Sequence, residues 1–453
     1  MHAPASMDTF WAAARRQTFL IVGFAPRTGL HAARLLERHG VRYKVSDQAP
    51  REDLAPLLDG LGIDPADVMA GPQGPNQLDG ITCVLLSPGV PRSIPLLREA
   101  SRRGIPVLVD IDFLYPLFAH KRIVAVTGTD GKTTTTSLLG ELLATSGRVV
   151  VAGNIGISVF AKTEEIASCD WLVLELSSFM LEAITQFRAD YSVVLNLSED
   201  HIDRYASRQE YAAAKLAIVQ HGRSGDTFVK NLDDPVLASF SPGHVHVRTI
   251  SERREDADVR FAGGTFHAGG FSYPHAACRL KGRQNIPNIL AALAIANEAG
   301  VESEAIAKVL AAFGGIAHRM QHVGTFRGVN VYEDSKASNV HAVEAALKNF
   351  ESNVVLILGG RDKGLDFTIL RPHARRLRRV VCYGESGEKI RECLGFEDAL
   401  YACRFEDAVR LAAAQCREGD ILLLSPGCTS WDQFANYEVR GDAFQQLMPE
   451  IFG

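Results

Sequence analysis

Apolar residues in the first part of the chain fall into short runs and helical spacings that alternate along the sequence. The runs typical of strands lie at residues 18–22, 41–47, 81–86 and 107–109. The first run is followed by a turn with two glycines at 23–29 and then by a helical pattern at 30–40, which is the order of a βαβ unit. We therefore predict that residues 1–118 form a small, doubly wound, Rossmann-like domain.

The same alternation resumes at residue 119 with a different strand-to-helix turn. Strand patterns lie at residues 122–127, 149–151, 171–175 and 192–196. Residues 226–280 are rich in glycine and carry short alternating runs, which indicate a β-rich segment, and a helical pattern returns at 286–300. We predict that residues 119–317 form a central domain on a mostly parallel sheet of the P-loop ATPase type.

A third alternation occupies the last part of the chain. Its strand patterns lie at residues 329–332, 354–358, 380–383 and 421–424. The basic cluster at 371–379 is interpreted as one solvated face of a helix. Residues 318–453 are predicted to form a second Rossmann-like domain, and the whole chain to be an α/β protein of three domains.

Composition agrees with several domains and excludes several classes of protein. At 453 residues with 46% hydrophobic content, the chain is too long for one compact core. It contains no run of 18 apolar residues and no signal-peptide pattern, so we expect a cytoplasmic protein that does not insert into membranes. Eight cysteines without a CxxC pair argue for reduced thiols and against a zinc site. A net charge of -5 with interspersed signs offers no field for nucleic acid, and we expect a monomer.

The strongest candidate for chemistry is the turn Thr127-Gly-Thr-Asp-Gly-Lys-Thr133, which follows a strand and opens a helix. Small residues allow backbone N–H groups to approach phosphates, and the helix N-terminus adds positive potential. Lys132 would reach the terminal phosphates of a nucleotide and Thr133 would hold Mg²⁺. The strict phosphate-loop pattern requires another glycine at Val126, so the alternative is a plain strand-to-helix turn. The coincidence of strand, glycines, lysine and threonine favours a phosphate loop.

Three charged residues downstream are candidates for metal or catalytic roles. Glu175 closes an apolar strand, where α/β sheets place their ligands, and a carboxylate there is suited to Mg²⁺. His201 and Asp203 follow another strand pattern, and the imidazole would ligate a metal or orient a carboxylate. Taken singly, His201 is more often a hydrogen-bonded structural residue, and Lys215, among Ala and Leu, reads as a snorkelling surface lysine.

Further motifs accompany these residues along the chain. Those of the central segment are Gly153-Asn-Ile-Gly156, Glu175-Leu-Ser-Ser-Phe-Met-Leu-Glu182, Asp200-His-Ile-Asp-Arg-Tyr205 and Ala214-Lys-Leu216. Those of the C-terminal segment are Ala317-His-Arg319, Asp334-Ser-Lys-Ala-Ser-Asn339, Gly359-Gly-Arg-Asp-Lys363 and Ser425-Pro-Gly-Cys-Thr-Ser-Trp-Asp-Gln-Phe434. With the phosphate loop, they resemble the signatures of the Mur ligase family in the same order. Within the family, they most resemble members that join D-glutamate to UDP-N-acetylmuramoyl-L-alanine.

The resemblance implies a role for each matching residue. It implies that the three domains bind the UDP-sugar, ATP with two Mg²⁺ ions and glutamate, in that order. ATP contacts are implied at Gly128, Thr129, Gly131, Lys132, Thr133, Thr134, Asn288, Arg319 and Asp334, and Mg²⁺ ligands at Thr133, Glu175, His201 and Lys215. Substrate contacts are implied at Arg27, Thr28, Gly29, Asp47, Asn154, Ser177, Lys336, Ser338, Lys363, Ser430 and Tyr437. Catalytic roles are implied for Lys132, His201 and Lys215, the last as a carbamate formed with CO₂, which would turn a cation that repels Mg²⁺ into an anion that binds it.

Four features depart from the family pattern. Asp130 stands where the family usually has Asn, Gln284 replaces the usual His, Ser338 replaces Thr, and the first glycine loop is longer. An acid beside polyphosphate would lower ATP affinity unless Mg²⁺ or Lys132 compensates, whereas Ser338 keeps the hydroxyl. None of these departures removes a residue that the chemistry requires.

The implied activity is ATP-dependent amide formation through an acyl phosphate, a step of peptidoglycan precursor synthesis. One alternative is a sibling ligase that uses L-glutamate, a diamino acid or a folylpolyglutamate substrate, and another is a nucleotide-binding switch without catalysis. Lys363 favours a dicarboxylate over a diamino acid, although no residue distinguishes the chirality of the glutamate. Glu175, His201 and Lys215 together count against the switch.

Overall fold

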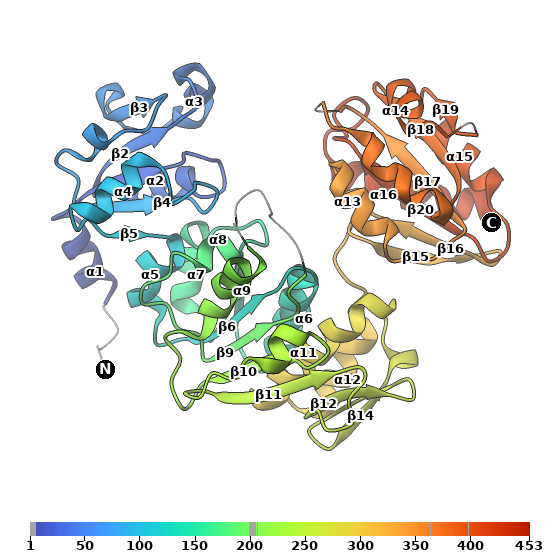
Figure 1. The fold of residues 1–453 in the computed structure, drawn as a ribbon, viewed down its shortest axis with the longest axis horizontal. Coiled ribbons are helices and arrows are strands. Elements are labelled where there is room, and N and C mark those ends of the chain that lie inside the picture. The colour runs from blue at the N-terminus through green and yellow to red at the C-terminus, as the bar shows by residue number, and fades with distance from the viewer. Residues whose placement is uncertain (1–5, 199–204, 206, 363, 397) are drawn as a thin grey trace. The chain divides into compact units, whose positions relative to one another are not determined.

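The computed structural model describes residues 6–198, 205, 207–362, 364–396 and 398–453. The chain divides into two compact units, Met1–Phe313 and Gly314–Gly453. Two sheets lie in the first unit and one in the second, and helices pack on the faces of each (Figure 1). The predicted α/β class is confirmed.

The first sheet has five parallel strands in the order β3-β2-β1-β4-β5. The strands are β1 (Thr18–Val22), β2 (Arg42–Asp47), β3 (Val68–Ala70), β4 (Cys83–Leu86) and β5 (Val107–Leu108). The helices of this segment are α1 (Met7–Ala14), α2 (Gly29–Arg38), α3 (Arg51–Leu58), α4 (Pro95–Arg102) and α5 (Asp110–Phe118), with 3-10 turns η1 (Pro65–Asp67) and η2 (Pro75–Leu78). Along β1, Phe19 and Ile21 pack into the core that holds α2 and α5, whereas Leu20 and Val22 pack against α4, as the period of two in a strand requires.

The central sheet has nine strands in the order β14-β13-β12-β11-β10-β9-β6-β8-β7. Its strands are β6 (Arg122–Thr127), β7 (Val149–Gly153), β8 (Trp171–Glu175), β9 (Tyr191–Val194), β10 (Thr227–Asn231), β11 (His246–Ser251), β12 (Val259–Ala262), β13 (Thr265–Ala268) and β14 (Phe271–Pro274). Strands β6 to β12 pair in parallel, and β13 and β14 continue the sheet in antiparallel pairs. The segment predicted to be β-rich therefore extends the central sheet.

Helices and 3-10 turns connect these strands. They are α6 (Lys132–Ala144), η3 (Val159–Lys162), α7 (Thr163–Ser168), α8 (Ser178–Leu181), α9 (Arg208–Leu216), η4 (Ala217–Val219), α10 (Pro235–Ser239), η5 (His275–Ala277), η6 (Arg283–Asn285), α11 (Ile286–Glu298) and α12 (Ser303–Ala312). One face of the sheet, with Val124 and Val126 of β6, packs on α6, α11 and α12. The other face, with Ile123 and Ala125, shares one continuous core with the first sheet through Phe113 of α5. This shared core explains why the first two sheets form one unit.

The sheet of the second unit has six strands in the order β15-β16-β20-β17-β18-β19. They are β15 (Gln321–Phe326), β16 (Val329–Glu333), β17 (Val354–Gly359), β18 (Leu377–Tyr383), β19 (Leu400–Ala402) and β20 (Ile421–Gly427). Only β15 is antiparallel among the strands described here. Helices α15 (Phe405–Gln415) and α16 (Tyr437–Phe452) cover one face, and α13 (Val340–Leu347), η7 (Phe367–Arg376) and α14 (Gly387–Leu394) cover the other.

The basic cluster at 371–379 is not one helical face, so that interpretation was wrong. The cluster begins in the 3-10 segment η7, which ends at Arg376, and continues into β18 from Leu377. Pro372 lies inside η7, and proline removes an N–H group and clashes with the preceding turn of an α-helix.

Among the helices that the structure describes, none combines the length and apolar character needed to cross a lipid bilayer.

A buried carboxylate joins α5 to the loop before β9. Asp112 is fully buried and accepts hydrogen bonds from the backbone N–H groups of Thr185 at 2.5 Å, Gln186 at 3.2 Å and Phe187 at 2.8 Å. The hydroxyl of Thr185 donates to it at 2.8 Å. A buried carboxylate is stable only when its oxygens are satisfied. These contacts therefore fasten the last helix of the first sheet to the central segment.

We expect Asp112→Ala to lower the free energy of unfolding by on the order of 3 kcal/mol, because it leaves the buried N–H group of Phe187 and the partly buried N–H groups of Thr185 and Gln186 without an acceptor. Urea denaturation followed by circular dichroism measures this change. The exposed Asp59, which directly follows α3, supplies the control Asp59→Ala, with an expected effect within about 0.5 kcal/mol. Equal stabilities of the two variants would contradict the role assigned to Asp112.

Candidate active site

The glycine loop lies at the carboxyl end of β6, and α6 begins directly after it at Lys132. Gly128 and Gly131 have φ values of 153° and 82°, a region that L side chains rarely adopt. A Cβ built on Gly131 would lie 2.0 Å from Oδ1 of Asn288 in α11. Asn288 is buried. The loop and α11 are thus in such close contact that only glycine fits at position 131.

Two lysine side chains converge on one carbonyl oxygen of this loop. The Nζ of Lys132 donates to the Gly128 carbonyl at 2.9 Å and to that of Thr129 at 2.7 Å. The Nζ of Lys215 donates to the same Gly128 carbonyl at 2.8 Å and lies 4.8 Å from the ring centroid of Tyr211. Lys215 is 2% exposed, so its interpretation as a snorkelling surface lysine was wrong. Two ammonium groups at one point favour an anion at this loop.

Two residues without a role in the sequence interpretation hold the loop in shape. Asn196 accepts from the backbone N–H of Asp130 at 2.8 Å through Oδ1 and donates to its carbonyl at 3.2 Å through Nδ2. The hydroxyl groups of Tyr211 and Thr129 lie 3.1 Å apart, within hydrogen-bonding distance. Tyr211 precedes Lys215 by one helical turn, and residues four apart share a helix face. The four-residue spacing between Tyr211 and Lys215 was therefore the one feature of the sequence that could have indicated that Tyr211 lies beside the loop.

The predicted magnesium ligands are placed only in part. Glu175, at the end of β8, is 2% exposed, and its Oε1 accepts from Nδ2 of Asn154 at 2.9 Å. Its Oε2 is buried without a hydrogen-bond partner among the described residues, a costly state that a hard cation relieves. Thr133 is buried in the first turn of α6 and Thr134 is partly buried, while His201 lies outside the described residues. Glu175 and the Thr133 hydroxyl thus offer oxygen donors of the kind that Mg²⁺ binds, and their role as its ligands stays a prediction.

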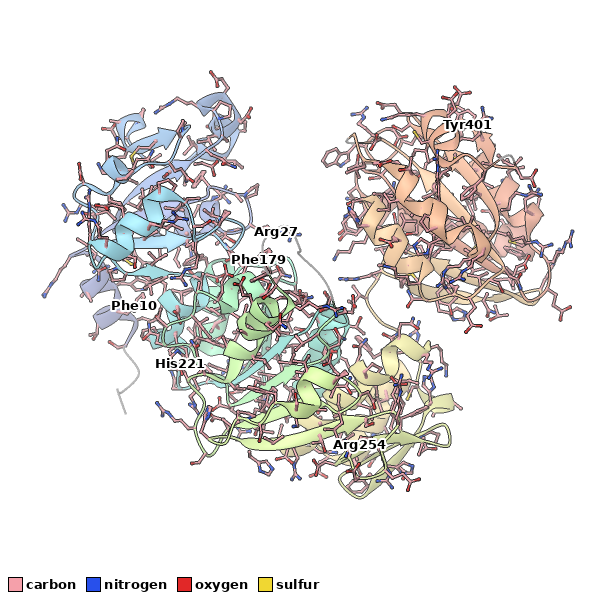
Figure 2. All side chains as sticks on the ribbon, in the orientation of Figure 1. Phe10, Arg27, Phe179, His221, Arg254 and Tyr401 are labelled. Atoms are coloured by element: carbon pink, nitrogen blue, oxygen red, sulfur yellow. The ribbon has the colours of Figure 1, made fainter. Side chains whose placement is uncertain are left out.

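Three predicted substrate residues surround the turn after β7. Asn154 donates its backbone N–H to the Glu175 carbonyl at 2.8 Å, and the hydroxyl of Ser177 caps α8. Arg27, labelled in Figure 2, comes from the glycine loop after β1. Its Nη2 would lie 3.9 Å from a Cβ built on Gly156. The first and central sheets therefore contribute side chains to one neighbourhood.

The other predicted residues of the first sheet shape a turn. The Asp47 carboxylate accepts from the backbone N–H groups of Phe24 at 2.5 Å and Ala49 at 2.8 Å. A Cβ on Gly29 would lie 2.8 Å from the Cα of Phe24, so a larger residue would displace the loop. Thr28 precedes α2 without capping it through its side chain. All three residues thus lie at the glycine loop after β1.

In the second unit, Asp334 is a buried acid at the end of β16. Its Oδ2 accepts from the Ser425 hydroxyl at 2.8 Å and its Oδ1 from the backbone N–H of Met320 at 3.1 Å. Burial raises the pKa of Asp334 to about 7, and the positive charge of Arg319 opposes that rise. Asp334 and Arg319 are thus near enough to interact, as the family resemblance implies for two residues of one ATP site.

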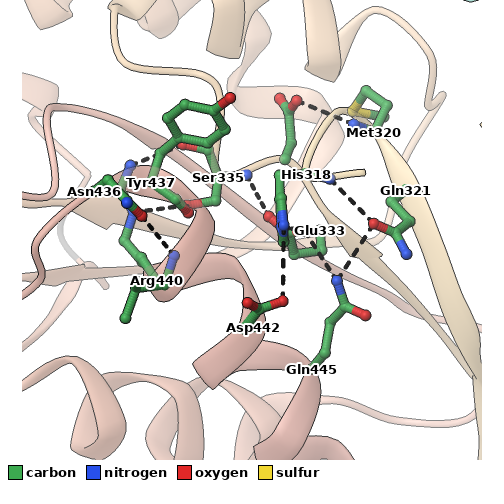
Figure 3. A network of polar contacts seen from close by, with 12 residues as sticks. His318, Met320, Gln321, Glu333, Ser335, Asn436, Tyr437, Arg440, Asp442 and Gln445 are labelled. Carbon is green, nitrogen blue, oxygen red and sulfur yellow. Dashed lines mark hydrogen bonds and ion pairs between the residues drawn. The ribbon is translucent and has the colours of Figure 1, made fainter. Parts of the chain in front are cut away.

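A polar network fixes the residue after Asp334 (Figure 3). The guanidinium of Arg440, which is 0% exposed, donates through Nε to the Ser335 hydroxyl and through Nη2 to the Ser335 carbonyl, both at 2.8 Å. It also donates to the Cys428 carbonyl at 3.1 Å. The Ser335 hydroxyl in turn donates to the carbonyl of Tyr437 at 2.8 Å. Arg440, which was missed from the sequence, therefore ties α16 to the loops that follow β16 and β20.

The remaining predicted residues of this unit are less closely connected. The Nζ of Lys336 lies 5.8 Å from the ring centroid of Tyr437. Ser430 is buried and its carbonyl accepts from the backbone N–H of Phe434 at 2.8 Å. Ser338 is half-buried before α13, and Lys363 lies outside the described residues. The structure thus joins Lys336 with Tyr437 and leaves the other contacts as predictions.

Comparison with known proteins places this geometry in a family. Residues 126–296 match the Mur ligase middle domain, and residues 318–428 match the Mur ligase glutamate ligase domain. A protein named UDP-N-acetylmuramoylalanine--D-glutamate ligase from Pelotomaculum thermopropionicum is 38% identical over 96% of this chain and 97% of its own. The chain belongs to the Mur ligase family. Proteins of the same name from Geotalea uraniireducens and Bacillus subtilis are 40% and 36% identical, each over 95% of this chain and 97% of theirs.

Solved structures of Mur ligases share the fold. UDP-N-acetylmuramate-alanine ligase MurC from Thermotoga maritima matches with a TM-score of 0.54 and 18% identity, over 96% of this chain and 99% of that chain. MurF ligase from Thermotoga maritima in complex with ADP matches with a TM-score of 0.53 and 19% identity, over 83% and 90%. The family resemblance inferred from the motifs is confirmed, and as a Mur ligase the chain is an ATP-dependent ligase.

We expect Gly131→Ala to weaken nucleotide binding at least about tenfold, because the new methyl group would overlap Asn288 and the backbone would be strained. Calorimetric titration with ADP and Mg²⁺ measures the dissociation constant. Gly300→Ala is the matched control, since Gly300 also has a positive φ of 78° but nothing within 4 Å of a Cβ. Unchanged ADP affinity in Gly131→Ala would show that the loop is not the nucleotide site.

The raised pKa of Asp334 predicts a pH dependence of stability. The folded protein keeps a proton that the unfolded chain releases above pH 4, so stability falls as the pH rises from about 4 to about 7 and is constant above that. Relative to Asp334→Asn, the wild type should lose at most about 4 kcal/mol across this window. Chemical denaturation at several pH values measures the difference. Asp110, whose pKa burial raises to about 6, is present in both proteins and cancels, so parallel profiles would refute the buried, protonated Asp334.

Proposed function

We propose that this chain joins D-glutamate to UDP-N-acetylmuramoyl-L-alanine with hydrolysis of ATP to ADP and phosphate, a step in peptidoglycan precursor synthesis. The observation that carries the proposal is the near full-length similarity, at 36–40% identity, to proteins that are named for this reaction. The convergence of Lys132 and Lys215 on the phosphate loop supports it, because amide formation from a carboxylate requires a nucleotide phosphate to be bound and transferred.

The division of labour among segments is part of this proposal. Residues 1–118 would bind the UDP-sugar, residues 119–317 ATP, and residues 318–453 glutamate. Arg27, Thr28, Gly29 and Asp47 would contact the UDP part, and Asn154 and Ser177 the muramoyl part. The position of Arg27 near Gly156 supports a substrate that extends from the first sheet to the central one.

The first chemical step would activate the substrate carboxylate. A carboxylate oxygen of the alanyl group would attack the γ-phosphorus of ATP, the bond from that phosphorus to the β,γ-bridging oxygen would break, and ADP would leave. The product is an acyl phosphate. Lys132 and the backbone N–H groups of the loop would bind the phosphates and stabilise the charge that builds up on the transferred group.

Thr133, Glu175 and His201, with a modified Lys215, would hold two Mg²⁺ ions, whose bound charge would neutralise the phosphate oxygens. The unpartnered Oε2 of Glu175 supports this assignment. The residues of the loop would meanwhile hold the polyphosphate in line with the incoming carboxylate.

Lys215 would carry a carbamate. Its neutral amine would attack the carbon of CO₂ and release one proton, which leaves an anion in place of a cation. The burial of Lys215 beside the Gly128 carbonyl supports this change, because two ammonium groups at one oxygen repel each other and one carbamate would remove that repulsion. Mass spectrometry of the intact protein in bicarbonate, compared with Lys215→Arg, would detect the added CO₂.

The second step would form the amide. The glutamate amine, in its neutral form, would attack the acyl carbon, and the tetrahedral intermediate would expel phosphate while the nitrogen loses its proton. Lys363, Ser338 and Ser430 would bind the glutamate carboxylates, and Tyr437 would pack beside them. Asn288, Arg319, Asp334 and Lys336 would contact the nucleotide. Arg440 would position Ser335 and, through it, the two neighbouring ATP residues.

We further propose that the protein acts as a monomer in the cytoplasm. All eight cysteines, each of which the structure describes, are free thiols. A reducing compartment keeps thiols in that state, and the same compartment supplies ATP.

Phosphate release from ATP, with UDP-N-acetylmuramoyl-L-alanine and one amino acid at a time, tests the proposed substrate. We expect release with D-glutamate and none with L-glutamate or a diamino acid. Release with L-glutamate or a diamino acid alone would assign the chain to a sibling activity and refute the acceptor proposed here.

The same assay tests the two loop lysines. Lys132→Ala and Lys215→Ala should lose at least about a thousandfold in kcat, since the first removes a positive charge at the transferred phosphate and the second removes a ligand of Mg²⁺. Lys162→Ala is the control, because Lys162 is paired on the surface with Glu165. Full activity of either loop variant would refute the role assigned to that lysine.

A further inference from the structure

A buried histidine and a buried glutamate face each other in the second unit (Figure 3). They are His318 and Glu333, the last residue of β16. The Nδ1 of His318 lies 2.7 Å from Oε2 of Glu333. Since a carboxylate oxygen only accepts hydrogen bonds, Nδ1 carries the proton and is the donor. Removal of either side chain would leave its buried partner unsatisfied, which is costly.

The pair joins two segments of the chain that carry proposed nucleotide contacts. His318 directly precedes Arg319, and its carbonyl accepts from the backbone N–H of Lys336 at 2.9 Å. The Oε1 of Glu333 accepts from the backbone N–H of Ser335 at 2.6 Å. One carboxylate therefore holds both segments, the first through Oε2 and the second through Oε1.

The backbone of the first segment has an uncommon conformation that its surroundings must stabilise. His318 has a φ of 61° and Met320 a φ of 44°, a region that residues with a Cβ adopt rarely. Such conformations persist where neighbouring contacts impose them. The contact of His318 with Glu333 is one, and the backbone N–H of Met320, which donates to Oδ1 of Asp334 at 3.1 Å, supplies another. The direction in which Arg319 leaves the backbone thus depends on contacts with the end of β16.

Helix α16 packs against the same pair. The Nε2 of Gln445 donates to Oε2 of Glu333 at 3.3 Å, and Nε2 of His318 lies 3.7 Å from Oδ1 of Asp442. A Cβ built on Gly441 would lie only 2.1 Å from Nδ1 of His318. The helix can approach so closely because Gly441 has no side chain, and this packing limits the rotation of the imidazole.

We propose that Glu333 and His318 are positioning residues of the ATP site, an inference that rests on the nucleotide contacts proposed for Arg319 and Lys336. Neither Glu333 nor His318 touches the nucleotide. Glu333 fixes the imidazole and the Ser335 N–H at once, so the backbone that carries Arg319 and Lys336 is ordered before ATP binds. A pre-ordered site loses less entropy when its ligand binds.

Calorimetric titrations of the full-length chain, one with ADP and Mg²⁺ and one with UDP-N-acetylmuramoyl-L-alanine, test this proposal. Glu333→Gln keeps the size of the side chain but offers one acceptor oxygen to two donors, the His318 ring and the Ser335 N–H. We expect the dissociation constant of ADP to rise at least about fivefold, because the backbone of its site is no longer pre-ordered. The constant of the UDP-sugar should stay within about twofold, since its proposed contacts lie in the first unit.

Asp420→Asn is the matched control for a general loss of stability. Asp420 is also a buried acid of the second unit, and it accepts from the backbone N–H of Arg417 at 2.8 Å. It precedes β20 at the edge of the sheet opposite to Glu333. We expect Asp420→Asn to lower the midpoint of urea denaturation, as Glu333→Gln does, and to leave ADP affinity unchanged. Weaker ADP binding in both variants, or in neither, would overturn the proposal.

A double variant tests whether the two residues act through one contact. His318→Leu removes the donor, and its combination with Glu333→Gln should weaken ADP binding no more than the more severe single variant does. Multiplied effects would show independent roles and overturn the pair as a unit. None of these titrations involves turnover. A wild-type chain that binds ADP but not the UDP-sugar would refute the proposed substrate, while the ADP titrations would still decide the role of Glu333 and His318.

Discussion

Parallel strands end at one edge of their sheet, and this constraint assembles the candidate site. Because β6, β7 and β8 are parallel, the glycine loop, the turn at Asn154 and the Glu175 side chain all leave the sheet at the same edge. The register places Glu175 opposite Val126 of β6 and Gly153 of β7. In the second unit, β16 and β20 are parallel, and their ends bring Asp334 and Ser425 into hydrogen-bonding contact. The geometry of the candidate site thus depends on sheet topology before it depends on any single residue.

Buried charged groups then give these edges a defined shape. Removing a charge from water is costly unless polar groups replace the water. Lys215 uses the Gly128 carbonyl, and Arg440 uses oxygens of Ser335 and Cys428. Such contacts are satisfied only when the loops adopt one conformation. The desolvation cost therefore stabilises particular loop geometries, which is what recognition of a polyphosphate and of a dicarboxylate requires.

Local patterns predicted the elements with continuous apolar runs. The strands at Thr18–Val22 and Trp171–Glu175 have the predicted bounds. Strand β15, Gln321–Phe326, was missed, because it is an antiparallel edge strand of partly exposed residues without an apolar run. The short strand Leu400–Ala402 was missed because its three partly exposed residues are too few to form a strand pattern. The basic cluster was assigned to a helix because the spacing of its charges was considered without Pro372, which disfavours an α-helix at that position.

The sequence by itself determined the order of the elements, the glycines of the phosphate loop and the family motifs, because backbone conformation and strand or helix periodicity depend on neighbouring residues. Only the tertiary structure decided which side chains share a site. Lys215 and Gly128 are 87 positions apart, and Arg440 and Ser335 are 105 apart. Burial, charge density and the raised pKa of Asp334 arise from such distant contacts, and a linear pattern does not contain them.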